Sequence, residues 1–168
     1  MKIAVKDANI LIDLELMGLF DLWFQLPYET LTTSLVVQEL RKGGHELALG
    51  YVGNNIESVA IDVFELAQEL ERYEDSGLSE PDVSVLYLAK LKRALLLSGD
   101  GKVRDTAAIE QVEIHGTIWI LDQLIEHNIL CPAVAASKLE YLLLLTREKK
   151  RFLPKVICEE RLANWRSS

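Results

Sequence analysis

The sequence has little cysteine and no long apolar run, and each absence excludes a class of protein. The two cysteines, Cys131 and Cys158, lie far apart with no metal-ligand spacing or disulfide framework, which argues against zinc-ribbon and thioredoxin-like proteins. Even the longer purely apolar runs, such as Leu142–Leu145, have only four residues, whereas a membrane span needs about 20 apolar residues. Asp7 stands where a signal peptide would need its apolar stretch. We therefore expect a cytoplasmic protein that does not associate with membranes.

An excess of basic residues is also missing. The chain has 18 Lys and Arg against 26 Asp and Glu, for a net charge of −8 at pH 7, so it lacks the general basic field that holds nucleic acid unspecifically. The charge is nevertheless uneven. Residues 138–168 carry eight basic against four acidic residues, and residues 1–137 carry a net charge of −12. This basic tail, above all residues 147–155, is where we expect phosphate to be held.

The length and composition fit one domain. A chain of 168 residues, 49% of them hydrophobic, can bury a core of ordinary size. We expect a single domain over residues 1–168, with a core of about 1–130 and a C-terminal helical extension of about 132–168. No internal repeat interrupts it.

Short apolar segments alternate with helical patterns along the chain. Strands are expected at residues 3–5, 28–32, 56–61, 94–97 and 112–114. Helices are expected at residues 11–16, 18–26, 35–41, 63–73, 79–92, 102–110, 118–127, 132–149 and 154–165, with 45–55 as a connection. This alternation predicts a mainly parallel sheet covered by helices on both faces, a three-layer α/β/α fold.

Two aspartates follow strands of this expected sheet. Asp7 comes directly after the first strand, and Asp100 comes after the fourth through Ser98 and Gly99. Ligands of open parallel sheets bind outside the carboxyl ends of the strands, so both side chains are expected at the same edge. Each also has a local explanation, because Asp7 can cap the next helix and Asp100 can form a turn with the glycine that follows it.

Two further carboxylates stand on expected helices. Glu39 lies three and four residues after Val36 and Leu35, on the face these apolar residues share. An ionised group there is costly unless it is paired or binds a metal, although a long side chain can also bend out to solvent. Asp82 lies three residues after Ser79, and a capping box explains this spacing without any function.

The order and context of these acids resemble the PIN-domain family. The segments that carry the resemblance are residues 5–12, 33–40, 78–89 and 97–104, around one acid each, and the His115-Gly116-Thr117-Ile118 step. The resemblance covers about residues 3–130. Within the family, the chain is similar to the VapC-like ribonuclease toxins. It implies an endoribonuclease that uses a metal to hydrolyse RNA phosphodiester bonds, with Asp7, Glu39, Asp82 and Asp100 as catalytic residues and metal ligands.

Convergence of these acids would require a cation. Two unit charges about 4 Å apart repel by roughly 4 kcal/mol at an effective dielectric constant near 20. Carboxylate oxygens favour Mg²⁺ or Mn²⁺, and no His or Cys stands at the matched positions to favour zinc. We expect Asp7 and Asp100 as direct ligands, and Glu39 and Asp82 as further ligands or as the group that orients the nucleophile.

Other polar residues are candidates for supporting roles. Those that could fix the carboxylates or touch phosphate are Asn9, Ser98, Asp105 and Thr117, although each is also explained by a local cap or a surface pair. Lys102 and Arg104 are candidates for contacts with the RNA backbone.

The resemblance further implies partners and leaves rivals open. Many proteins of this family are toxins held inactive by a small antitoxin, and they commonly form homodimers. The apolar run Tyr141–Leu145 offers a contact for either partner unless it belongs to the core. A phosphohydrolase of the haloacid-dehalogenase type needs a second acid two residues after its aspartate, where this chain has Asn9. A catalytically weak or inactive PIN-like module that binds RNA or protein is the alternative from a different class.

Overall fold

The computed structural model describes residues 1–146 and 153–168. Its sheet consists of β1 (Lys2–Lys6), β2 (Tyr28–Thr33), β3 (Ile56–Val59), β4 (Leu95–Leu97) and β5 (Ile114–His115). The strands run in the order β3-β2-β1-β4-β5, and every neighbouring pair is parallel. The expected parallel α/β sheet is therefore confirmed.

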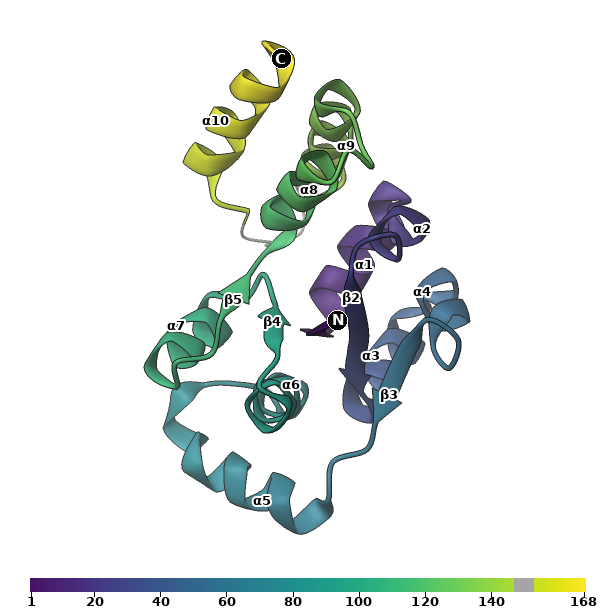
Figure 1. Ribbon diagram of the computed structural model, residues 1–168. Helices are drawn as coiled ribbons and strands as arrows, with labels where there is room; N and C mark the ends of the chain where they lie inside the picture. The colour runs from purple at the N-terminus through teal and green to yellow at the C-terminus, as the bar shows by residue number, and fades with distance from the viewer. Residues whose placement is uncertain (147–152) are drawn as a thin grey trace.

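Helices cover the sheet on both faces. They are α1 (Ala8–Met17), α2 (Phe20–Trp23), α3 (Ser34–Gly43), α4 (Glu46–Tyr51), α5 (Val63–Arg72), α6 (Glu80–Lys92), α7 (Gly101–Ile109), α8 (Thr117–Glu126), α9 (Pro132–Leu145) and α10 (Lys155–Arg166), with a short 3-10 helix η1 (Glu74–Ser76). Figure 1 shows α1, α2, α8 and α9 on one side of the sheet and α6 and α7 on the other, with α10 packed on α9. None of the helices in the described ranges has both the length and the apolar character that a bilayer span requires.

The order in which strands are added to the sheet reverses at β1. The sequence runs outward from β1 through β2 to β3, and then returns to the other side of β1 for β4 and β5. The loops that leave β1 and β4 therefore diverge from neighbouring strands, which is where ligands of open parallel sheets bind. The two strand ends are tied together, since the backbone N–H of Asp7 donates to the carbonyl of Leu97 over 3.1 Å.

The core lies between the sheet and its two helix layers. Val5 on the central strand and Leu96 on its neighbour are completely buried, as are Leu14 on α1 and Leu86 on α6. Each such side chain stabilises the fold by about 1.5–3 kcal/mol relative to leaving it exposed. Burial on both faces explains why β4 reads as an unbroken apolar run.

Polar caps mark the helix starts at the carboxyl edge of the sheet. Asp7 caps α1, Thr33 caps α3 and Asp100 caps α7, each by accepting a hydrogen bond from a backbone N–H of the first turn. Such caps satisfy N–H groups that otherwise lack partners. Because the partial positive charge of a helix dipole lies at its N-terminus, this edge favours negative charge.

Two segments differ from the sequence-based expectation. The helix expected at 18–26 is only the short α2: Phe20 and Trp23 are buried from within it, whereas Leu26 reaches the core from the turn that follows. The connection expected at 45–55 contains α4. Its start is held by Glu15 of α1, whose carboxylate pairs with His45 Nδ1 at 2.6 Å and accepts the Ala48 N–H at 3.1 Å. A local pattern cannot reveal this partner.

The tail of the chain is helical as expected. Pro132 begins α9 as its first helical residue, where a missing N–H costs nothing. The expected continuation of this helix to 149, and most of the basic segment 147–155, lie outside the described residues.

Candidate functional site

Asp7 is the most buried acid at the carboxyl edge of the sheet, with 3% of its surface exposed. Its Oδ1 accepts the backbone N–H of Ile10 at 2.9 Å, and its Oδ2 accepts the hydroxyl of Ser98. Burial, with a smaller contribution from the charges of Asp82 and Asp13, raises the pKa of Asp7 to about 7 in spite of these two hydrogen bonds. The protein alone therefore does not balance a negative charge at this position.

A small pocket brings Asp7 together with Glu39 and Asp82. Its volume is about 20 Å³, room for about one water-sized group. The lining residues are Asp7, Ala8, Asn9, Val36, Glu39, Pro81 and Asp82. The loop after β1 and the helices α3 and α6 each contribute a carboxylate, so segments far apart in sequence converge here.

Glu39 reaches this pocket from an exposed position. α3 buries Val36, Val37 and Leu40 while Glu39 is exposed at the border of that apolar face, where it lines the pocket together with Val36. Partial burial and the charge of Asp82 still raise the pKa of Glu39. Its carboxylate thus senses the same negative potential as Asp7.

Asp82 serves as a cap and as a pocket residue. Its Oδ2 accepts the backbone N–H of Ser79 at 2.9 Å and the Ser79 hydroxyl at 2.7 Å, and the Ser79 hydroxyl accepts the N–H of Asp82. The capping box expected from the sequence is therefore present. The same hydrogen bonds hold the carboxylate at the pocket wall.

Asp100 lies outside the pocket but is connected to it. Its Oδ1 accepts the N–H of Val103 at 3.0 Å, and its own N–H donates to the Ser98 hydroxyl oxygen at 3.2 Å. Because that hydroxyl in turn donates to Asp7, Ser98 links the two aspartates. This is the supporting role for which the sequence made Ser98 a candidate.

A fifth acid, Asp13, was missed by the sequence analysis. It lies on α1, is 6% exposed, and its Oδ2 accepts the hydroxyl of Thr117 at 2.6 Å. Thr117 therefore supports Asp13, whereas the sequence assigned it to the four expected acids or to phosphate. The signal that could have revealed Asp13 is a charged residue between the apolar Ile12 and Leu14.

The candidate cations lie beside this edge. Arg104 is exposed on α7, and its Nη2 lies so close to Gly116 that a Cβ there would stand 3.2 Å from it and 3.7 Å from the carbonyl of Ser98. The guanidinium is thus next to the loop that follows β4. Lys102 donates to the carbonyl of Gly77 at 3.3 Å. Asp105 is exposed on α7 and does not line the pocket.

A buried lysine precedes Asp7 on β1. Lys6 is fully buried, and its Nζ stands 3.1 Å from the ring centroid of Trp23. Among the described residues this Nζ has no hydrogen-bond partner. Burial lowers the pKa of Lys6 well below its ordinary value. Lys6 is therefore a poor source of positive charge for Asp7.

The donor set fits a hard divalent cation. The carboxylates of Asp7, Glu39 and Asp82 line the pocket together with Asn9, and such oxygen ligands suit Mg²⁺ or Mn²⁺. Burial, and after it the charge of Asp82, raises the pKa values of Asp7 and Glu39, and a bound cation would stabilise their ionised forms. Within residues 1–146 and 153–168, no three His, Cys, Asp or Glu side chains already form a cluster that could hold a metal ion, and Asp82 and Asp100 are engaged in caps.

Fold and site together define an α/β protein with an acidic pocket at the switch point of a parallel sheet. A family model described as a PIN domain matches residues 3–167, so the chain belongs to the PIN-domain family. PIN domains are generally nucleases, and the family typically uses divalent metal ions. The match extends through the C-terminal helices, beyond the residues that carried the resemblance in the sequence.

One solved structure illustrates the shared fold. It is the crystal structure of PAE2754 from Pyrobaculum aerophilum, which is 16% identical to this chain with a TM-score of 0.53. The similarity covers 74% of this chain and 98% of PAE2754. At this identity it supports the fold alone. No protein among those with curated descriptions matches the sequence.

Proposed function

We propose that this protein is a metal-dependent endoribonuclease that hydrolyses RNA phosphodiester bonds. The observation that carries the proposal is the carboxyl group of Asp7, which is buried at the end of the central strand with a pKa raised to about 7 and shares a pocket with two further carboxylates. A domain gains nothing from concentrating like charges in this way. A function that takes up a cation accounts for the arrangement.

Asp7, Glu39 and Asp82 would hold Mg²⁺ or Mn²⁺, with Asp100 beside them through Ser98. A divalent cation bound there lowers the pKa of a water and neutralises charge on a phosphodiester. The protein's own contribution is orientation. Ser98 fixes one oxygen of Asp7, and Ser79 fixes Asp82. The carboxylates are thus held in place by hydrogen bonds, as the ligands of metal sites generally are.

The substrate would be held by local contacts. With a net charge of −8 the molecule lacks a general attraction for phosphate, so individual cations at the site must supply it. Arg104, beside the loop after β4, is the best placed of the described cations, and Lys102 lies on the same helix. The choice of RNA over DNA rests on the family resemblance.

We extend the proposal to the toxin of a toxin–antitoxin pair, acting as a homodimer. Exposed apolar side chains on α9 support a partner surface, since Tyr141, Leu144 and Leu145 are 50%, 64% and 38% exposed. Val156 and Ile157 on α10 add to it, with 66% and 42% exposed. Light scattering of the purified protein tests the dimer, and the variant Leu144→Asp should shift the mass to that of a monomer.

The nuclease is tested with fluorescently labelled single-stranded RNA in Mn²⁺, in Mg²⁺ and in EDTA. Cleavage is expected with either metal and not in EDTA, and Asp7→Asn and Asp100→Asn should reduce it by roughly 10–100-fold or more. Asp75→Asn, an exposed aspartate of η1, is the matched control and should cleave normally. Equal cleavage in every sample would indicate a contaminating nuclease and remove the proposal.

A catalytically weak or inactive RNA-binding module is the second candidate. It is favoured by the engagement of Asp82 and Asp100 in helix caps. Metal-dependent RNA binding without cleavage would decide for it. Stability measured without RNA distinguishes the nuclease and the binding module from a purely structural site. Mn²⁺ at 100 times its Kd should raise the free energy of unfolding of the wild type by about 2.7 kcal/mol, and that of the Asp7→Asn variant much less.

A further inference from the structure

A second hollow lies at the amino ends of β2 and β3, at the opposite end of the sheet from the acidic pocket. We call it the β2–β3 groove. Its volume is about 720 Å³, within the range of ligand sites. Its lining consists of Met1, Phe24, Tyr28, Glu29, Thr30, Val52, Gly53, Asn54, Asn55, Ile56, Glu57 and Ser58. The proposed nuclease makes no use of it.

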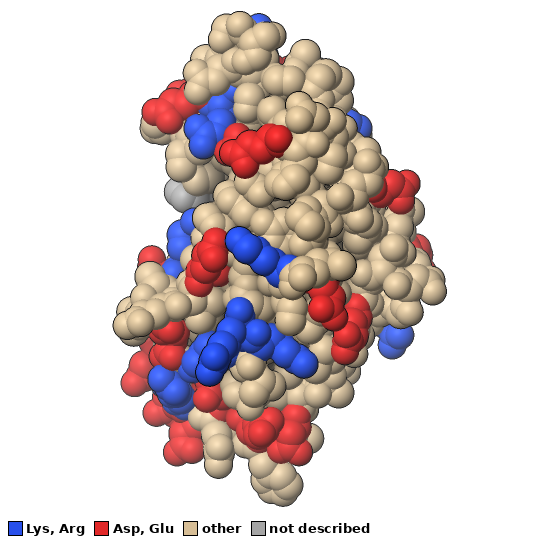
Figure 2. All heavy atoms as spheres, viewed as in Figure 1, with Lys and Arg blue, Asp and Glu red and all other residues tan. Residues whose placement is uncertain are grey.

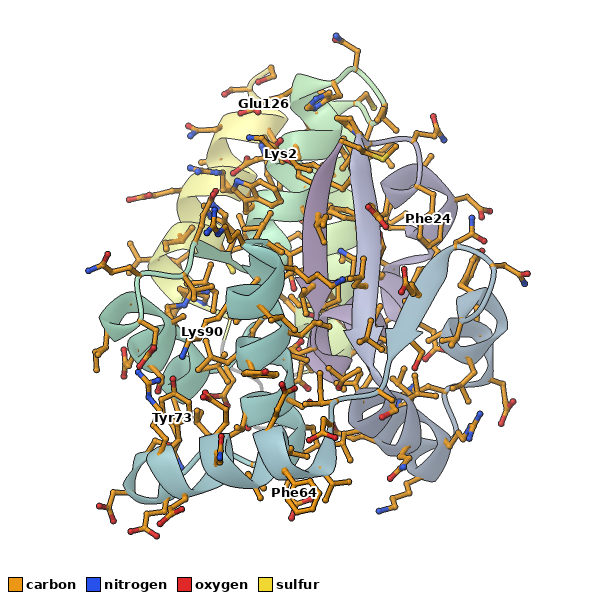
Figure 3. All side chains as sticks on the ribbon, turned by 60° about the horizontal axis from the view of Figure 1, so that its bottom comes forward. Lys2, Phe24, Phe64, Tyr73, Lys90 and Glu126 are labelled. Atoms are coloured by element: carbon orange, nitrogen blue, oxygen red, sulfur yellow. The ribbon has the colours of Figure 1, made fainter. Side chains whose placement is uncertain are left out.

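Two half-buried aromatic rings provide its apolar wall. Phe24 follows α2 and lies beside the start of β3 (Figure 3), where its ring stands 5.3 Å from that of Tyr51. Tyr28 begins β2 and stacks on the buried Trp23 at 5.4 Å. Rings held by such contacts lose little conformational entropy when a ligand packs on them. The wall is therefore built before any ligand arrives.

The charged side chains of the groove are all acidic. Glu29 and Glu57 are exposed, lie on neighbouring strands, and are the acidic side chains among the lining residues. Apart from the amino terminus, no lining residue carries a positive charge. Acidic side chains gather over this part of the sheet in Figure 2. A polyanion such as RNA is disfavoured here, and a cationic ligand is favoured.

The surroundings extend this negative potential. Burial and the charges of Glu113 and Glu126 raise the pKa of Tyr28. The nearest cation of the neighbouring strand is Lys2, which is paired in register with Tyr28 but does not line the groove. The acidic character is thus a property of the region and not of one side chain.

We propose that the β2–β3 groove binds an extended segment of a partner protein in which large apolar side chains are flanked by Lys or Arg. The segment passes over the amino ends of the strands: its apolar side chains pack against Phe24 and Tyr28 on one face of the sheet, and its flanking cations pair with Glu29 and Glu57, which alternate with Tyr28 and Ile56 and point to the other face. The side chains of Asn54, Asn55 and Ser58 offer hydrogen bonds to the backbone of the segment. This site is independent of the nuclease and would remain if the protein cut no RNA.

Fluorescence anisotropy with synthetic peptides tests the proposal. The probe is a fluorescein-labelled Lys-Arg-Phe-Leu-Lys-Arg peptide, compared with Glu-Asp-Phe-Leu-Glu-Asp and with Lys-Arg-Gly-Ser-Lys-Arg. Only the first is expected to bind, and more weakly at high salt, which screens exposed charges. The double variant E29K/E57K should bind at least about tenfold more weakly, a loss of about 1.4 kcal/mol.

The double variant E71K/E74K is the matched control, because it makes the same change of net charge at exposed positions on α5 and η1. It should bind as the wild type does, and equal melting temperatures show that all variants fold. Equal loss in both double variants, equal binding of the Gly-Ser peptide, or no binding of any peptide would overturn the proposal. Displacement of the peptide by single-stranded RNA would overturn it in favour of a nucleic-acid site.

Discussion

The hydroxyl of Ser98 donates a hydrogen bond to Oδ2 of Asp7 across 91 positions of sequence. The bond joins the carboxyl ends of the parallel strands β1 and β4, between which the strand order of the sheet reverses. The same hydroxyl accepts the N–H of Asp100. One small side chain therefore sets the relative position of the two aspartates that the sequence placed at this edge.

Ser98→Ala should destabilise the protein by about 1–3 kcal/mol and more at pH 8 than at pH 5. At pH 8 the alanine variant leaves an ionised buried carboxylate without its donor, and hydrogen bonds to charged groups are the stronger ones. Urea unfolding at both pH values measures the difference. Ser84→Ala is the control, since this buried serine bonds Thr33 and the Pro81 carbonyl and should cost the same at either pH.

Asp7 itself should make stability depend on pH. Its folded pKa of about 7 lies above an unfolded value near 3.9, so its favourable contribution is complete below about pH 4 and is lost as the pH rises through 7. Three pKa units correspond to at most about 4 kcal/mol. In EDTA, the free energy of unfolding of Asp7→Asn should therefore increase relative to that of the wild type between pH 4.5 and 8.

Urea denaturation across this pH range provides the measurement, with Asp75→Asn expected to follow the wild-type curve. Parallel curves for wild type and Asp7→Asn would show that Asp7 does not titrate in this window.

Asp82→Asn should separate capping from function. Because the oxygen of an Asn side chain still accepts hydrogen bonds, the stability should fall by less than the roughly 0.5–2 kcal/mol that removing a cap costs, whereas RNA cleavage should fall by roughly 10–100-fold or more. Asp62→Asn is the matched control, because Asp62 caps α5 through two backbone N–H groups and does not line the acidic pocket. It should show a comparable change in stability and unchanged cleavage. An equal fall in cleavage would assign the effect of Asp82 to folding.

Asp13 and Thr117 should be energetically coupled. Their hydrogen bond of 2.6 Å is buried and connects α1 with the start of α8. In a double-mutant cycle with Asp13→Asn and Thr117→Val we expect a coupling of about 1–3 kcal/mol. Thr106→Val, whose hydroxyl donates to the Lys102 carbonyl one turn earlier in its own helix, should cost less. If the two single substitutions have additive effects on stability, Asp13 and Thr117 are not coupled.

Lys6→Met should stabilise the protein at pH 7 by about 1 kcal/mol or more. The ammonium is buried over Trp23, and a buried charge without a hydrogen-bonded partner is costly. Because burial lowers the pKa of Lys6, the wild type gains stability as the pH rises from its folded pKa toward 10.5. The advantage of Lys6→Met should therefore shrink at pH 9.5. Lys2→Met, exposed on the same strand, should stay within about 0.5 kcal/mol.

The sequence by itself determined the alternation of strands and helices, the caps and the order of the acids along the chain. These features depend on side-chain periodicity and on bonds across three or four residues, such as those of Asp7, Asp82 and Asp100 to their own helices. A local pattern contains that information, except where a distant partner is needed, as Glu15 is for α4.

Only the tertiary structure decided which side chains meet. The strand order β3-β2-β1-β4-β5 places Ser98 against Asp7, the packing of α1 and α8 pairs Asp13 with Thr117, and the convergence of α3 and α6 gives the exposed Glu39 a place in the acidic pocket. Such contacts, and the burial that moves the pKa of Asp7, depend on distances between segments dozens of residues apart. Those distances are fixed by the packing of the whole core.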